Sequence, residues 1–255
     1  MKKIIAALSI VMLTISTTSM AQPKTVTLKF IETSDVHGCF FPYNFTTGKE
    51  MRGSMARVST YVKELRKEYG DNLILLDNGD ILQGQPISYF YNYVNTDEEN
   101  IAASVINYMK YDTGTIGNHD IETGHSVYDK WIKEVKCPVI AANIVCFDTL
   151  KQQAIPYTSS ESNNTRRCYT QPYTILEREG IRIAIVGMLT PAIPSWLKEE
   201  LWQGLRFEEI AKSAKQAANY LKDKEKADII IGLFHSGWDG GIKTEEYTED
   251  ATKQV

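Results

Sequence analysis

Short apolar runs alternate with amphipathic stretches along most of this sequence, and this alternation restricts the folds open to it. Residues 73–76 are continuously apolar, which is typical of a strand covered on both faces. In residues 55–69 the apolar side chains recur at helical spacing, and Gly70 follows as a helix-ending residue. Strand–helix alternation predicts an α/β fold in which helices pack on a sheet.

The remaining elements follow from the same patterns. Further strands are expected at 26–31, 113–116, 138–142 and 228–234, and further helices at 100–109, 127–135 and 207–221. Residues 173–177 and 181–186 flank Gly180 and are expected to form an antiparallel hairpin, so mixed β-sheets covered by helices are predicted. Residues 147–170 are expected to form a polar excursion.

The N-terminus has the pattern of an export signal. Met1-Lys2-Lys3 is positively charged, residues 4–15 are mostly apolar, and Ser19-Met20-Ala21 places small residues at a cleavage site. The apolar run is too short to cross about 30 Å of hydrocarbon as a helix. We therefore expect a signal peptide at 1–21, a mature chain of 22–255 that is periplasmic or secreted, and no stable membrane insertion.

The net charge of the chain limits the kinds of molecule that it is expected to bind. The formal net charge is −4, with 28 Lys and Arg against 32 Asp and Glu. A protein that grips a nucleic-acid backbone needs a basic face, so no nucleic-acid polymer is expected as partner. An acidic protein that binds a small anion needs local positive charge, which bound metal ions supply.

Four loops after predicted strands carry side chains that can bind metals. The first loop carries Asp35 and His37, the second carries Asp80, the third carries Asn118, His119 and Asp120, and the fourth carries His235. Carboxylate and imidazole together suit Zn²⁺, Mn²⁺ or Fe²⁺ better than Ca²⁺. Taken singly, Asp80 could be a turn residue, Asn118 a helix cap and His235 a core histidine. Active sites of open α/β sheets lie beyond the carboxyl ends of the strands, where all four loops fall.

Together these loops resemble a known family. The segments Asp35-Val36-His37, Gly79-Asp80-Ile81-Leu82-Gln83-Gly84, Gly117-Asn118-His119-Asp120 and His235 look like the successive blocks of the calcineurin-like metallophosphoesterases. With the signal peptide, the spacing resembles the exported 5′-nucleotidase / 2′,3′-cyclic-nucleotide phosphodiesterase branch. The resemblance implies a four-layer α/β/β/α sandwich.

The resemblance also implies roles for individual residues. Asp35 and His37 would bind one divalent metal ion, Asn118 and His235 a second, and Asp80 both; the ions could be Zn, Mn, Mg or Fe. Asn118 and His119 would contact the substrate, a small nucleotide or other phosphate ester. His119 would act catalytically while metal-activated water attacks phosphorus in line. Either Glu122 or Asp120 would orient His119, and Glu122 is favoured.

Two features depart from the family pattern. A Gly-His-x-His block and a C-terminal domain that stacks the nucleoside base would be expected after His235, and neither appears in 236–255. We therefore expect the fold to be incomplete at the C-terminus and metal binding by this chain to be weak. The alternatives are UDP-sugar hydrolysis on the same core and a truncated remnant without catalysis.

Most of the aromatic side chains singled out in the sequence are interpreted as packing residues rather than as parts of a binding site. The run 89–93 is expected to pack rather than to stack on a base, as are Trp196 and Trp202. Trp238 follows His235 closely and could line a pocket.

Overall fold

The computed structural model describes residues 25–148, 153–154 and 168–255. The expected signal peptide and most of the polar excursion at 147–170 lie outside the described residues. In the part of the chain that is described, no helix combines the length and apolar character needed to cross a membrane.

The structure alternates strands and helices along the chain. The strands are β1 (Lys29–Thr33), β2 (Tyr43–Asn44), β3 (Lys49–Glu50), β4 (Leu73–Asp77), β5 (Thr113–Gly114), β6 (Ile144–Asp148), β7 (Gln153–Ala154), β8 (Tyr173–Arg178), β9 (Ile181–Leu189), β10 (Leu205–Phe207), β11 (Ile229–His235), β12 (Gly240–Lys243) and β13 (Thr248–Asp250). The helices are α1 (Met55–Tyr69), α2 (Pro86–Tyr89), α3 (Ile101–Met109), α4 (Asn118–Glu122), α5 (His125–Glu134), α6 (Ile193–Trp196) and α7 (Ile210–Asp223). Single turns lie at Gly70–Asn72, Glu199–Leu201 and Thr252–Gln254, and a π-helical turn lies at Phe90–Val94.

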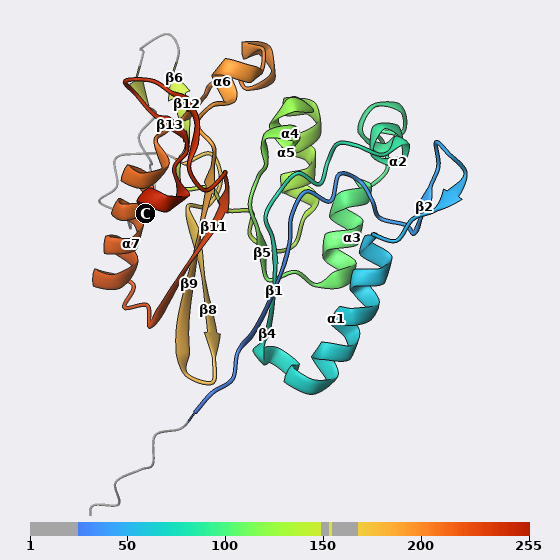
Figure 1. Ribbon diagram of the computed structural model, residues 1–255, viewed down its shortest axis with the longest axis horizontal. Helices are drawn as coiled ribbons and strands as arrows, with labels where there is room; N and C mark the ends of the chain where they lie inside the picture. The colour runs from blue at the N-terminus through green and yellow to red at the C-terminus, as the bar shows by residue number, and fades with distance from the viewer. Residues whose placement is uncertain (1–24, 149–152, 155–167) are drawn as a thin grey trace, which may run out of the picture.

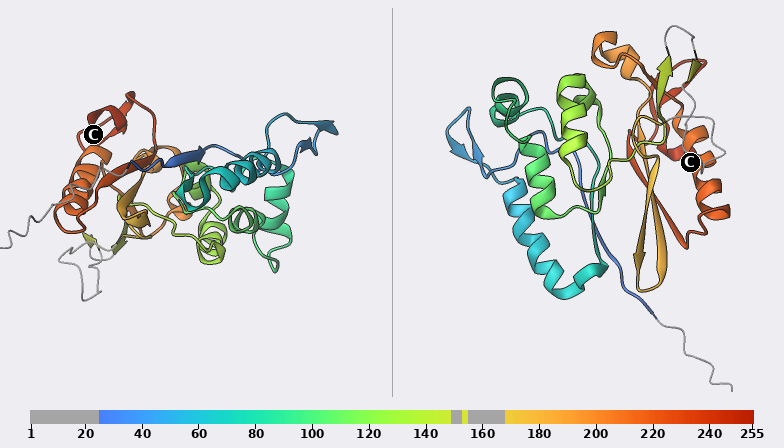
Figure 2. Two further views of the ribbon diagram at one scale, coloured as in Figure 1. Left: turned by 90° about the horizontal axis from the view of Figure 1, so that it is seen from below. Right: turned by 180° about the vertical axis from the view of Figure 1, so that it is seen from behind.

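Two three-stranded sheets face each other, with helices on both outer sides (Figure 1). One sheet is parallel, in the order β1-β4-β5, and the other, β11-β9-β8, is mixed. Helix α7 covers the second sheet, and α1, α3 and α5 cover the first. The view from behind in Figure 2 shows the same layers in reverse order. The α/β/β/α sandwich expected from the sequence is confirmed, and the predicted antiparallel hairpin, formed by β8 and β9, makes one of its two sheets mixed.

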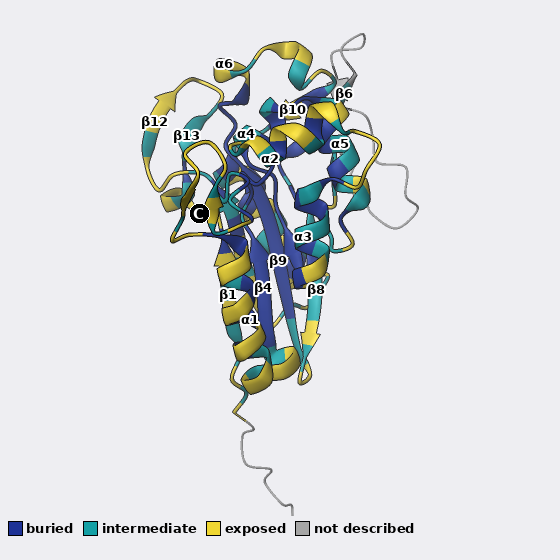
Figure 3. Cartoon of the chain, turned by 90° about the vertical axis from the view of Figure 1, so that its right-hand side faces the viewer, coloured by how far each residue is buried: buried dark blue, intermediate teal, exposed yellow. Residues whose placement is uncertain are grey.

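Three apolar clusters fill the spaces between the four layers. In β4, Leu73 and Leu75 pack toward the helices, while Ile74 packs between the sheets with Ile183 and Ile185 of β9. Ala184 of β9 lies between Ile183 and Ile185 and packs on the opposite face of the sheet, against α7. Strand β4 and residues 183–189 of β9 are buried on both faces, as the centre of Figure 3 shows, and this explains the apolar runs in their sequences.

Helix ends follow local chemistry. Helix α1 begins after Ser54, whose side chain accepts the N–H of Arg57, and ends at Gly70, which has φ +56°. Helix α3 begins after Asn100, whose side chain accepts two backbone N–H groups. These capped helices match their predicted ranges closely.

Two predicted ranges were wrong. Residues 138–142 pair with Gly114 and Gln171 only through isolated bridges and do not form a continuous strand. The helix expected at 207–221 begins at Ile210, because Phe207 belongs to β10 and pairs with Ile144. In both places long-range pairing overrides the local pattern.

The carboxyl ends of β1, β4, β5 and β11 meet at one edge of the sandwich, uppermost in Figure 1. The side-chain amide of Asn78, after β4, donates to the carbonyl of Phe234 in β11 at 3.2 Å. This bond joins the two sheets at the edge where the candidate residues lie.

Candidate functional site

The loops after β1 and β4 are held together by their backbones. Asp35 donates its N–H to the carbonyl of Gly79 at 3.1 Å, and His37 donates to the carbonyl of Asp80 at 2.9 Å. Asp35, His37 and Asp80 all have left-handed backbones, with φ of 52°, 48° and 59°. Each costs about 1–2 kcal/mol in an L-residue, and such strain clusters at functional sites. The cross-loop bonds maintain this conformation.

Glycine is required at two close approaches in these loops. A Cβ on Gly117 would lie 2.1 Å from Oδ1 of Asp80, and one on Gly84 would lie 2.3 Å from the carbonyl oxygen of His37. Gly84 also has φ +139°, which L side chains rarely adopt. The two glycines therefore let the loops pack against the predicted ligands.

The five predicted metal-binding side chains converge on one point. Nε2 of His235 lies 3.3 Å from Oδ2 of Asp80 and 3.0 Å from Oδ1 of Asn118. Nε2 of His37 lies 3.9 Å from Oδ2 of Asp80 and 3.9 Å from Oδ1 of Asp35.

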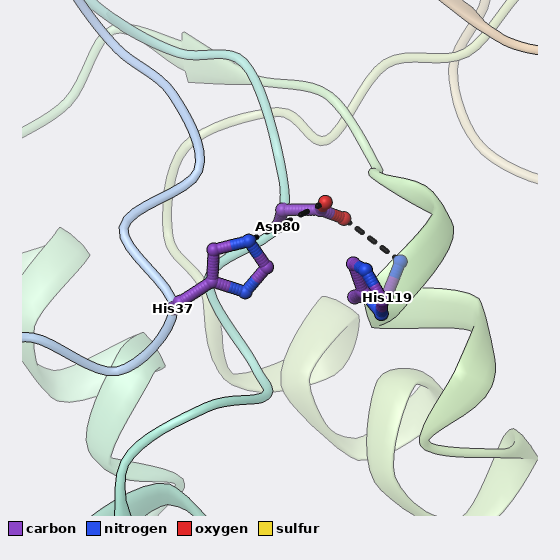
Figure 4. Close-up of side chains that lie close together, drawn as sticks. All are labelled: His37, Asp80 and His119. Carbon is purple, nitrogen blue, oxygen red and sulfur yellow. Dashed lines mark hydrogen bonds and ion pairs between the residues drawn. The ribbon is translucent and has the colours of Figure 1, made fainter.

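Two groups of potential ligands share Asp80. In the first, donor atoms of His37, Asp80 and His119 lie within 4.8 Å of one another (Figure 4). In the second, donor atoms of Asp35, Asp80 and His235 do so. This grouping differs from the predicted one, which placed Asp35 with His37 and left His119 out.

Backbone carbonyls orient two of the imidazoles. Nδ1 of His235 lies 2.6 Å from the carbonyl oxygen of Asn78, and Nδ1 of His37 lies 3.2 Å from that of Gln83. Each ring therefore uses Nδ1 as a donor and turns Nε2 toward Asp80. A hydrogen bond from the ring nitrogen that does not face the metal fixes the tautomer and the ring orientation that a histidine ligand needs.

The electrostatics of the site fit a cation. Asp80 is 2% exposed, and its ion-pair partners among the described residues are His37 and His235. Burial acts to lower the pKa of His235, but the hydrogen bond and charge of Asp80 outweigh it and raise the pKa to about 9. Burial acts to raise the pKa of Asp80, and His235 outweighs it, so that pKa is lowered. A buried carboxylate surrounded by imidazole, amide and further carboxylate donors matches the ligand preferences of Zn²⁺, Mn²⁺ and Fe²⁺.

Of the two carboxylates close to His119 in the sequence, that of Glu122 contacts the imidazole ring. Oε2 of Glu122 lies 2.6 Å from Nδ1 of His119, so the Glu122 carboxylate engages that nitrogen of the ring and not Nε2. His119 is partly exposed, and its ring lies 5.2 Å from that of His37.

Asp120 points into the interior. Its Oδ2 accepts the backbone N–H groups of Asp80 and Gly117, and its Oδ1 accepts those of Ile81 and Leu82, at 2.8–2.9 Å. The side chain is fully buried. The prediction of Asp120 as a catalytic partner of His119 is therefore wrong in this structure, because the carboxylate is used to hold the Asp80 loop.

Another buried carboxyl lies beneath the site. Asp77, the last residue of β4, is 1% exposed, and its Oδ1 accepts a bond from the hydroxyl of Thr33 at 2.9 Å. The same hydroxyl lies 2.8 Å from that of Tyr111. Burial raises the pKa of Asp77 to about 8, so this carboxyl is neutral over much of the acidic range.

A cavity of about 330 Å³ opens at the convergence point. Asp35, Asn118 and His235 line it, together with Trp196 and Asp250. Sequence reasoning missed Asp250, because no local pattern marks a carboxylate that arrives from β13. Trp196 was expected to pack, whereas this side chain is 43% exposed.

The profile of the calcineurin-like phosphoesterases matches residues 28–253. The chain belongs to this family. Its members use divalent metal ions, and the two groups of potential ligands that share Asp80 are consistent with that chemistry.

Known relatives of this phosphoesterase are nucleotide hydrolases. It is 29% identical to the trifunctional nucleotide phosphoesterase protein YfkN of Bacillus subtilis, over 83% of this chain and 14% of that protein. It is 28% identical to the 2′,3′-cyclic-nucleotide 2′-phosphodiesterase/3′-nucleotidase of Haemophilus influenzae, over 91% of this chain and 35% of that protein. The chain thus spans about a third or less of the length of these relatives.

A solved structure confirms the fold. The crystal structure of calcineurin-like phosphoesterase YfkN from Bacillus subtilis superposes with a TM-score of 0.72 at 28% identity. The match covers 88% of this chain and 66% of that one. This chain is therefore a metallophosphoesterase related to 5′-nucleotidases and cyclic-nucleotide phosphodiesterases.

Proposed function

We propose that this phosphoesterase hydrolyses phosphate esters of nucleotides at a site for two divalent cations. Asp35 and His37 would hold one cation, Asn118 and His235 would hold the other, and Asp80 would contribute to both. The observation that carries this proposal is the central position of Asp80, whose Oδ2 lies 3.9 Å from Nε2 of His37 and 3.3 Å from Nε2 of His235. The relatives' names support nucleotides as the substrate class.

The bound cations would neutralise phosphate charge and activate water for attack on phosphorus. The chain's own residues perform the remaining tasks. Asn118 is the first residue of α4, and the backbone N–H of the next residue, His119, donates to Oδ1 of Asp80 at 2.8 Å. The start of α4 therefore positions both proposed substrate-binding residues, Asn118 and His119, next to Asp80.

Proton transfer to the leaving oxygen is assigned to His119. Glu122 occupies Nδ1, so Nε2 is the atom from which a proton can pass to the ester oxygen. The Glu122 carboxylate also stabilises the protonated ring. A positioned general acid contributes typically about 10²–10⁴-fold to rate.

The proposal takes residues 22–255 as the catalytic domain and residues 1–21 as a cleaved signal peptide, which places the activity in the periplasm or outside the cell. The charged start, apolar run and small residues of 1–21 support the export step. Mass spectrometry of the exported protein tests it: a mature N-terminus at Gln22 is expected, and retention of Met1 contradicts it.

Hydrolysis assays test the activity. Phosphate release from AMP, 2′,3′-cyclic AMP and UDP-glucose is measured with Mn²⁺ or Zn²⁺ and after chelation. Asp80→Asn is expected to abolish turnover of every substrate. Asp71→Asn is the matched control, because Asp71 is exposed at the amino end of β4, away from the site. Equal activity of both variants would contradict the proposal.

A further inference from the structure

The candidate metal ligands are supplied by both sheets of the sandwich. Asp80 follows β4 in the first sheet, and His235 is the last residue of β11 in the second. The packing between the sheets is apolar, with Ile74 of β4 and Ile183 of β9 in one cluster. Apolar contact is non-directional, so it holds the sheets together without fixing the position of β11 along β4. A metal site needs its ligands placed within about 0.5 Å, which requires directional bonds between the sheets.

Asn78, which directly follows β4, makes bonds of this kind with two successive residues of β11. Its side-chain amide nitrogen donates to the carbonyl of Phe234 at 3.2 Å, and its own carbonyl oxygen lies 2.6 Å from Nδ1 of His235. Its backbone N–H donates to the carbonyl of Thr33, the last residue of β1, at 2.7 Å. Asn78 therefore connects the ends of β1, β4 and β11, two residues before Asp80.

The two bonds from Asn78 to β11 act on different parts of the strand end. The backbone carbonyl orients the imidazole of His235, and it can do so only while the end of β11 stays beside it. The side-chain bond holds the main chain of β11 at Phe234, one residue earlier. Loss of the side-chain bond therefore frees the strand end and weakens the bond to the ring as well. Nε2 of His235 would then no longer be held 3.3 Å from Oδ2 of Asp80.

The side chain of Asn78 is placed at a cost to folding. Its amide oxygen is buried and has no hydrogen-bond partner among the described residues. A buried acceptor without a partner is unfavourable, and an apolar side chain of similar size would avoid this cost. Costs of this kind are expected at functional sites, so the amide is best explained by the position that its donor gives to β11.

We propose that Asn78 is a positioning residue that sets the place of His235 relative to Asp80, and with it the affinity of the cation position to which His235 contributes. The inference rests on the proposed two-cation site and deepens it, but it does not depend on the identity of the substrate. Asn78 acts through His235 and needs no contact with the cation or the ester.

Calorimetric titration with Mn²⁺ compares the wild type with Asn78→Leu, which keeps the size of the side chain and removes its donor. Removal of a group that orients a ligand lowers metal affinity by about 10- to 100-fold, and this loss is expected at one cation position only. Urea unfolding in chelator is expected to have nearly the wild-type midpoint, because removal of the unpaired acceptor offsets the lost bond. Wild-type affinity at both positions, or an equal loss at both, would overturn the proposal.

Asn107→Leu is the matched control. Asn107 is partly buried like Asn78, and its side-chain amide donates to the carbonyl of Glu134 at 2.9 Å, joining α3 to α5. Helix α3 leads into the amino end of β5, opposite to the edge where the candidate ligands lie. This variant is expected to lower the unfolding midpoint and to leave both metal affinities unchanged, which is the result that a merely structural amide gives.

A measurement without metal separates this proposal from the proposed function. In chelator, the Nδ1 proton of His235 is expected to give a slowly exchanging low-field NMR resonance that is absent from His235→Asn. It is expected to exchange faster in Asn78→Leu and at the wild-type rate in Asn107→Leu. If the wild type binds no Mn²⁺, the proposed two-cation site fails, and faster exchange still supports the positioning of His235 by Asn78. An unchanged exchange rate in Asn78→Leu overturns that positioning, whatever the metal affinity.

Discussion

Replacing Asp120 by Asn tests whether this buried carboxylate holds the Asp80 loop. The amide nitrogen cannot accept a hydrogen bond, so whichever oxygen it replaces, two of the four backbone N–H groups lose their acceptor. Each orphaned buried donor costs about 1–3 kcal/mol, so Asp120→Asn is expected to lower the free energy of unfolding by roughly 2–6 kcal/mol.

The same change should weaken metal binding. Asp80 is expected to move when two of the hydrogen bonds from Asp120 that hold its loop are lost. Loss of a group that positions a metal ligand typically lowers metal affinity by about 10- to 100-fold. Urea unfolding in the presence of a chelator measures the first effect. Calorimetric titration with Mn²⁺ or Zn²⁺ measures the second.

Glu122→Gln is the matched control. Glu122 is three residues away, partly exposed, and hydrogen-bonded to His119. We expect its substitution to lower kcat while unfolding stays within about 0.5 kcal/mol of the wild type and metal affinity is unchanged. An Asp120→Asn protein that unfolds and binds metal like the wild type would refute the anchoring role.

Three further predictions address the rest of the site. Gly117→Ala is expected to abolish metal binding, because the new Cβ would lie 2.1 Å from Oδ1 of Asp80; calorimetry should show no such loss for Gly53→Ala, where nothing lies within 4 Å. His119→Ala should lower kcat by about 10²–10⁴-fold with metal affinity unchanged, and a large loss of affinity would instead make His119 a ligand. Burial raises the pKa of Asp77 from 3.8 to about 8, so its stabilising contribution is present below pH 3.8 and is lost as pH rises to 8. Urea unfolding in chelator at pH 5 and pH 8 should therefore show a smaller decline for Asp77→Asn than for the wild type; parallel declines would contradict a neutral Asp77.

The sequence determined the elements and the edge at which chemistry gathers. A strand buried on both faces must be apolar throughout, so β4 was visible in residues 73–76 without its neighbours. Parallel strands bring their carboxyl ends to one edge, so Asp35, Asp80 and Asn118 were expected together. His235 joined them from the second sheet at the same edge.

Only the tertiary structure decided how individual side chains are used. Glu122 is three residues after His119 on α4 and shares its face, whereas Asp120 is one residue after it and turns toward the loop at 80–82. The sequence shows two acids near one histidine; the direction of each depends on the helix and on what packs behind it. Trp196 likewise faces a cavity that forms only when β11, β13 and α6 meet, since local apolarity carries no information about which neighbours arrive from distant segments.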